Sequence, residues 1–162
     1  MPISAAAFRR ALAQFATGVT VVTTRNDAGN PLGLTVNAFC SVSLDPPLVL
    51  ACIDNRSDAN AGLQASRVFG VSILSEEQEA FSRRFATPGR EKFGAKDLHT
   101  GESGVPLVPH ALAHLECRLV AFHPAGDHTV YVGEVLRIEV RPGRPLLYHG
   151  SGYRKLEPDP AK

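Results

Sequence analysis

Apolar and polar positions follow regular spacings along most of the chain, and the first spacing is helical. Phe8, Leu12 and Phe15 recur at i, i+4 and i+7, which places them on one face of a helix. Ser4 is a suitable N-cap, and Gly18 can end the helix in a left-handed conformation. The pattern predicts a first helix with one buried face.

Strand patterns dominate the remainder of the chain. Residues 18–25 are nearly all β-branched, residues 26–30 have turn chemistry, and residues 31–39 return as a second strand. Pro46 and Pro47 mark a corner, because consecutive prolines cannot serve a central ladder. Further strands are predicted over residues 41–44, 48–53, 68–74, 114–123, 128–140 and 145–150.

Two more short helices are predicted, one over residues 59–65 and one that opens at the capping box Ser75–Gln78. Residues 86–109 are irregular, and a connection of that length is more often functional than idle. Most links between strands are too short for parallel crossovers, and closing the sheet into an antiparallel barrel removes its edges. The fold class predicted is mainly β with flanking helices. Residues 1–156 are expected to form a single domain and 157–162 a flexible tail.

Charge and hydropathy exclude several classes of partner. The 162 residues include 17 Lys and Arg against 16 Asp and Glu, a net charge of +1. A balance this close to zero gives no electrostatic reason to expect nucleic acid or an anionic membrane as partner. No apolar run approaches the roughly 20 residues needed to cross a bilayer. We therefore expect a cytoplasmic protein with no nucleic-acid or membrane partner.

Most familiar catalytic and metal motifs are missing from the sequence. It contains no G-x-G-x-x-G, no P-loop and no G-x-S-x-G. His110 and His114 have i, i+4 spacing but lack the glutamate of H-E-x-x-H, so no metal site is expected. Cys40, Cys52 and Cys117 form no C-x-x-C pair, and each is expected to be a buried, reduced thiol.

Small hydroxyl and amide side chains gather at predicted strand ends. They occur in TVNAFCSVS (residues 35–43) and after the strand at 48–53, and Arg83 and Arg84 follow later. A ligand with an apolar ring, a polar ring edge and a phosphate suits this mixture. The same residue types are common in turns, so the pattern alone leaves both interpretations open.

Seven segments of the chain are similar to segments of a known protein family and occur in the same order as in that family. They are FATGVTVVTT (15–24), GLTVNAFCSVSLDPPLVLACID (33–54), FGVSILSEEQEAFSRRFA (69–86), EKF (91–93), HLEC (114–117), GDHTVYVGEV (126–135) and PLLYHGSGYRKL (145–156). Together they resemble the flavin reductase-like family, the reductase components of two-component flavin monooxygenases. The resemblance implies a six-stranded antiparallel split β-barrel, the FMN-binding split barrel. It also implies a homodimer with the flavin near the subunit interface.

The resemblance also implies site residues, position by position. It assigns the isoalloxazine and ribityl wall to Thr35, Asn37, Ala38 and Ser41. It brings Cys52, Ile53 and Asp54 past the flavin, partly through main-chain atoms, and Ser57 into a phosphate-contacting turn. Where the family often has Thr or Ser two residues later, this chain has Ala59, which implies either that one phosphate hydroxyl is missing or that Asn60 substitutes for it. Arg84 and Phe85 approach the flavin, His128 is the catalytic residue at the nicotinamide, and Tyr148 and Tyr153 are candidates for the nicotinamide pocket.

The implied activity is that of an NAD(P)H:flavin oxidoreductase that supplies reduced FMN or FAD to a partner monooxygenase. Hydride transfer from nicotinamide C4 to flavin N5 needs the rings stacked roughly 3–3.5 Å apart, with no triad or carboxylate dyad. Two alternatives stay open at this point. One is an oxidoreductase with bound FMN that acts on another small substrate, and the other is a flavin-binding protein without enzymatic activity. The sequence does not separate FMN from FAD or NADH from NADPH.

Overall fold

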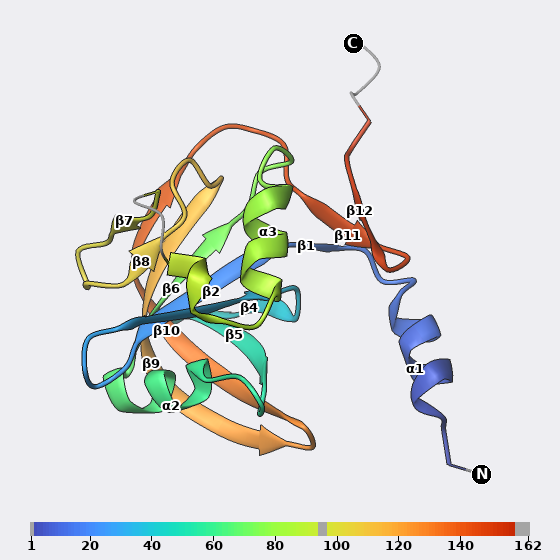
Figure 1. The fold of residues 1–162 in the computed structure, drawn as a ribbon, viewed down its shortest axis with the longest axis horizontal. Helices are drawn as coiled ribbons and strands as arrows, with labels where there is room; N and C mark the ends of the chain where they lie inside the picture. The colour runs from blue at the N-terminus through green and yellow to red at the C-terminus, as the bar shows by residue number, and fades with distance from the viewer. Residues whose placement is uncertain (1, 94–96, 158–162) are drawn as a thin grey trace.

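The chain folds around an antiparallel sheet that curls into a barrel (Figure 1). The computed structural model describes residues 2–93 and 97–157. Within them the main sheet has seven strands in the order β3-β2-β6-β9-β10-β5-β4. Their bounds are β2 Thr20–Arg25, β3 Pro31–Val36, β4 Phe39–Leu44, β5 Pro47–Asp54, β6 Val68–Ile73, β9 Ala113–Ala125 and β10 His128–Val140.

The predicted antiparallel split barrel is confirmed, with one strand more in the sheet than predicted. The predicted strand over 31–39 is interrupted, because β3 ends at Val36 and β4 begins at Phe39. Residues 37–38 carry the chain from one edge strand of the sheet to the other. The ladders of the described residues join β3 only to β2, and β4 only to β5. The barrel is therefore split between β3 and β4.

Side chains pack in two separate cores on the two sides of the sheet. The inner core contains Val22, Ile53, Phe69 and Tyr131, and Leu63 of α2 (Ala59–Ser66) packs into it. An added Cβ at Gly133 would lie 2.3 Å from the Phe69 ring, so glycine is required for this close approach.

The outer core lies on the other face of β2, under α3 (Glu79–Ala86). It consists of Val19, Val21, Leu74, Phe85, Val108 and Leu146. Val21 and Val22 enter different cores because successive side chains of a strand point to opposite faces. The predicted capping box forms in part, since Gln78 Oε1 accepts the main-chain N–H of Ser75 at 3.0 Å, although α3 begins only at Glu79.

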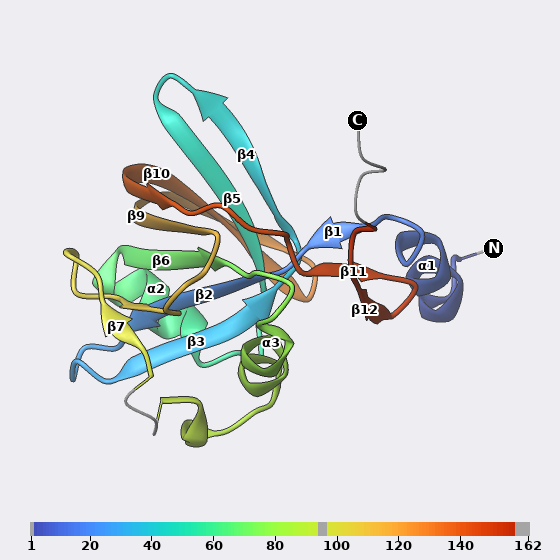
Figure 2. The ribbon, with the colours of Figure 1, turned by 90° about the horizontal axis from the view of Figure 1, so that it is seen from above.

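A small sheet joins the two ends of the described chain. It has the order β1-β11-β12, formed by Thr17–Gly18, Leu147–His149 and Gly152–Arg154. Figure 2 shows this sheet beside the barrel, next to α1. Beyond Ala86, where α3 ends, the irregular stretch predicted over 86–109 contains only η1 (Arg90–Phe93), β7 (His99–Thr100) and β8 (Pro106–Leu107) among its described residues.

The first helix differs from its prediction. α1 spans Ala5–Leu12 with Ser4 as N-cap, whose hydroxyl accepts the Ala7 N–H at 3.2 Å, but it ends well before Gly18. The expected buried face is exposed: 59% of Phe8, 51% of Leu12 and 72% of Phe15 face solvent. The reason is visible in both views, where α1 stands away from the barrel and finds no partner on it (Figures 1 and 2).

The remaining expectations have mixed outcomes. Only Cys117 is a buried thiol, while Cys52 is half-buried and Cys40 exposed, because both lie on the outward face of their strands. No helix of the described residues is long and apolar enough to cross a membrane. The predicted tail, apart from Glu157, lies outside the described residues.

Candidate functional site

The outer face of β4, β5 and β10 brings several predicted site residues together. Odd-numbered β5 residues such as Ile53 enter the inner core, so Cys52 and Asp54 point outward. Cys52 lies opposite Val130 and Asp54 opposite His128 in the β5–β10 ladder. On the other side, the Cys52 N–H donates to the Ala38 carbonyl at 3.0 Å. Burial, with Cys40 nearby, raises the pKa of the Cys52 thiol, which is therefore neutral at neutral pH.

Two predicted residues fall away from this face. The Ile53 side chain is fully buried, so only its main chain can reach a ligand. Ser41 lies opposite Val49, an inner-face residue, and is therefore on the other side of the β4–β5 hairpin from Cys40 and Cys52.

The turn before α2 is organised by its own side chains. Asn60 Nδ2 donates to the carbonyls of Asp54 at 2.7 Å and Ser57 at 3.0 Å, and Asn60 Oδ1 accepts the Tyr131 hydroxyl at 2.8 Å. Ser57 Oγ accepts the Ala59 N–H at 3.3 Å. The amide of Asn60 is thus occupied in shaping the turn, and it does not replace the missing hydroxyl as a free phosphate donor. The hydroxyl proton of Ser57 is left to donate to a ligand.

His128 begins β10 and sits between two carboxylates. Its Nδ1 lies 2.7 Å from Asp127 Oδ1, and 43% of its side chain is exposed. The hydrogen bond from His128 holds the pKa of Asp127 below its ordinary value, and the hydrogen bonds from Arg56 do the same for the pKa of Asp54. Both carboxylates are therefore ionised at neutral pH. With Nδ1 held by Asp127, Nε2 is the ring atom left for a ligand.

The wall formed by β3 and α3 contains three more of the predicted residues, Thr35, Arg84 and Phe85. Thr35 Oγ1 donates to the Ser82 carbonyl at 2.6 Å, which fixes the hydroxyl while leaving its lone pairs able to accept. Arg84 pairs with Asp97 at 2.7 Å and lies over the Phe81 ring, and its buried Nε has no partner among the described residues. Phe85 does not reach the site: its ring is fully buried, edge-to-face against Phe93.

Tyr148 and Tyr153 pack edge-to-face at 5.5 Å in the β11–β12 hairpin. Tyr148 and Asn37 line a cavity of about 250 Å³ with the hairpin turn and α1. This cavity joins a predicted flavin residue to a predicted nicotinamide residue, far apart in the sequence.

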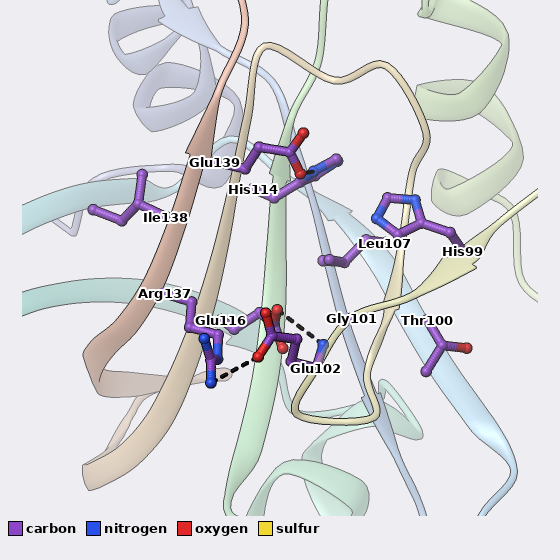
Figure 3. Close-up of a pocket in the computed structure, with 10 residues that line it drawn as sticks. All are labelled: His99, Thr100, Gly101, Glu102, Leu107, His114, Glu116, Arg137, Ile138 and Glu139. Carbon is purple, nitrogen blue, oxygen red and sulfur yellow. Dashed lines mark hydrogen bonds and ion pairs between the residues drawn. The ribbon is translucent and has the colours of Figure 1, made fainter.

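A second cavity, of about 290 Å³, lies elsewhere and contains none of the predicted residues (Figure 3). Its charged groups are paired within the protein: Arg137 with Glu102, Glu139 with Arg141, and Glu116 with the N–H groups of Glu102 and Ser103. His114 lies in β9 rather than on a helix with His110, and its Nε2 is 2.6 Å from the Val108 carbonyl. No cluster of three metal-ligating side chains occurs within the described part of the chain.

Sequence reasoning did not single out Ser82, Asp97 or Asp127. Asp127 could have been found, because it directly precedes His128 in the short connection between two predicted strands. The hydroxyls of Ser82 and Tyr153 lie 2.7 Å apart, a contact without any local sequence signal because the two residues belong to distant elements.

Comparison with known proteins places this arrangement in a family. The model of the flavin reductase like domain matches residues 12–157. The chain belongs to the flavin reductase-like family. It is 46% identical over 149 residues to FMN reductase (NADH) SmoA of Agrobacterium fabrum, covering 92% of this chain and 84% of the relative. It is 40% identical to the reductase subunit HsaB of a flavin-dependent monooxygenase from Rhodococcus jostii, over 94% of this chain and 78% of the relative.

A solved structure agrees with this assignment. The NADH:FAD oxidoreductase of Streptomyces globisporus C-1027, in complex with NAD and FAD fragments, superposes with a TM-score of 0.89 at 41% identity. The match covers 95% of this chain and 93% of that one. This flavin reductase-like chain therefore shares its barrel fold with a relative solved in complex with NAD and FAD fragments.

Proposed function

We propose that this chain is an NADH-dependent flavin reductase that transfers hydride to FMN or FAD and releases reduced flavin to a partner monooxygenase. The observation that carries the proposal is the convergence of Asn37, Ala38, Cys52 and His128 around one end of the split barrel, in a chain 46% identical to an NADH-dependent FMN reductase. Residues 1–156 are assigned to one such domain.

The described residues fit a flavin nucleotide. Cys52 and Val130 offer a neutral, half-buried surface for a ring, and Asn37 offers an exposed amide for the polar ring edge. Ser57 precedes the N-terminus of α2, where main-chain N–H groups favour a phosphate. The buried Nε of Arg84 supplies a further donor. Bound flavin supplies the N5 atom that accepts hydride.

The protein's own part is to bind and orient. Asp127 holds His128 so that Nε2 faces outward beside the Cys52–Val130 surface, where it can contact the visiting nicotinamide nucleotide. Asn37 and Tyr148 line one cavity, which is where the two nucleotides would meet. No residue is required to transfer a proton during the hydride step.

The proposed assembly is a homodimer. α1 buries none of its residues in its own chain, and a helix this short needs tertiary packing of its apolar face. Leu136, Ile138 and Val140 add an exposed apolar row on one face of β10. A second copy of the chain is the occupant that we assign to these surfaces. We place the reaction in the cytoplasm, because it consumes a nicotinamide nucleotide.

Steady-state oxidation of NADH and of NADPH, with FMN, FAD or riboflavin added in excess, tests the activity. We expect NADH consumption that depends on free flavin and continues over many turnovers. Consumption that needs only tightly held FMN and a different acceptor would support the first alternative enzyme. The absence of oxidation with every flavin would leave a binding protein.

A further inference from the structure

Ser82 is a buried residue that contacts both the predicted flavin wall and the predicted nicotinamide pocket. It lies in α3 with no exposed surface. Its carbonyl accepts the Thr35 hydroxyl at 2.6 Å, and its own hydroxyl lies 2.7 Å from the Tyr153 hydroxyl, a hydrogen bond in which either group can donate. Thr35 belongs to the predicted flavin wall and Tyr153 to the predicted nicotinamide pocket.

The C-terminal hairpin needs such an anchor. β11 and β12 have three residues each, and a hairpin of this size is not stable alone. Among the described residues, its ladder with β1 is limited to Leu147 and Tyr148, and single main-chain hydrogen bonds from Leu146 to Leu74 and from Gly150 to Ala13 add to it. Side chains must therefore supply much of its position.

The ring of Tyr153 is held on three sides. The Ser82 hydroxyl binds its oxygen, the Arg83 guanidinium lies over its face at 4.9 Å, and Tyr148 meets it edge-to-face at 5.5 Å. Tyr148 in turn lines the cavity that contains Asn37. A displacement of Tyr153 would thus move the wall of the nucleotide cavity.

We propose that Ser82 is a positioning residue for the nicotinamide nucleotide: its hydroxyl fixes Tyr153 and, through it, the hairpin wall of the nucleotide pocket. The inference rests on the proposed reductase function. The two hydrogen bonds of Ser82 can be tested separately. The substitution S82A removes the hydroxyl that holds Tyr153 and keeps the carbonyl that holds Thr35.

The test is a double-mutant cycle with S82A, Y153F and the double variant, with T87A as control. Thr87 follows the same helix, and its exposed hydroxyl donates only to the Arg83 carbonyl among the described residues. For each protein, KM and kcat are measured with NADH at saturating flavin, and flavin affinity is measured by fluorescence titration. Thermal unfolding midpoints verify that each variant is folded.

We expect S82A and Y153F each to raise KM for NADH about threefold to tenfold, the effect of one hydrogen bond. The KM of the double variant for NADH should not exceed that of the more impaired single variant, because both substitutions remove the same interaction. Flavin affinity and the T87A kinetics should stay within about twofold of wild type.

An unchanged KM for NADH in Y153F, which alters a half-exposed residue and should fold, would overturn the inference. So would additive effects in the double variant, or equal losses of flavin and NADH affinity. A wild-type protein that oxidises no NADH would instead refute the proposed function, so the two failures are distinguishable.

Discussion

His128 lies directly opposite Asp54 in the ladder between β10 and β5. Hydrogen bonds between adjacent residues stabilise this pairing. The Asn55 N–H donates to the Asp127 carbonyl at 2.9 Å, and the Thr129 hydroxyl donates to Asn55 Oδ1 at 2.8 Å. The turn before β10 and the turn before α2 are therefore held together as one end of the barrel. A nucleotide bound beside His128 is also beside the main chain of residues 54–57.

His128→Ala should raise KM for NADH about tenfold and change KM for flavin much less. The reason is that Asp127 orients the ring toward the visiting nucleotide, and removing the ring removes one contact with it. Steady-state kinetics with each substrate varied in turn measures both constants. His110→Asn, at an exposed position in the loop before β9, is the control because it removes an imidazole away from this face of the barrel. An unchanged nucleotide KM would remove His128 from the site.

Asn37→Ala should weaken flavin binding about threefold to tenfold, because an exposed amide that suits the polar ring edge is lost. The side chain of Asn37 makes no hydrogen bond among the described residues, so the effect on stability should be small. Flavin fluorescence titration measures the affinity, and Asn30→Ala in the exposed β2–β3 turn controls for a general loss of an amide. Identical affinities for wild type and N37A would reject the flavin wall.

Acid should destabilise the protein partly through Glu116. Burial acts to raise the pKa of Glu116, but hydrogen bonds from Ser103 and Glu102 outweigh it and hold the pKa below its ordinary 4.5. A lowered folded-state pKa means that the stabilisation is fully present above about pH 4.5 and is lost as pH falls through the folded value.

Glu116→Gln should therefore cost about 1.5–3 kcal/mol at pH 7 and flatten the fall in stability toward acid. Urea unfolding at neutral pH and at about pH 3.5 measures both effects, with Glu77→Gln at an exposed position as control. An equal loss of stability in wild type and E116Q over that interval would contradict the assignment.

Leu12→Asp should convert the proposed homodimer to monomers. The substitution puts a charge in the middle of the exposed apolar face of α1, which we assign to contact with a second copy. Size-exclusion chromatography with light scattering gives the mass. Ala6→Asp adds the same charge on the other side of the helix and should leave the dimer intact. A wild-type protein that is monomeric would refute the assembly.

Much of the fold could be predicted from local pattern. The strand predicted over residues 128–140 matches β10 at both ends, and Tyr131 and Gly133 share its inward face because alternate residues of a strand point the same way. The spacing of Phe8, Leu12 and Phe15 predicted a buried helical face, but α1 ends at Leu12 and these side chains are exposed, because the spacing within one chain does not say what covers an apolar face. Strand β12 was missed because three residues that include Gly152 carry almost no strand signal.

The site was predictable only in part for a related reason. The resemblance assigned site residues by their position along the chain, but the direction in which each side chain points depends on the register of its strand. Ile53 and Cys52 are neighbours in sequence and point to opposite sides of β5. Phe85 shares a helix with Arg84 yet fills the outer core. Contacts such as that of Ser82 with Tyr153 arise only when distant elements pack.

Mixing the protein with one equivalent of FMN and excess NADH in the absence of oxygen tests the central claim most directly. We predict that the visible absorbance of oxidised flavin disappears far faster with wild-type protein than with FMN and NADH alone. When NADH is still in excess over FMN but below its KM, H128A should slow this loss. Bleaching at the same rate with and without the protein would contradict the claim that this end of the barrel brings the two nucleotides together.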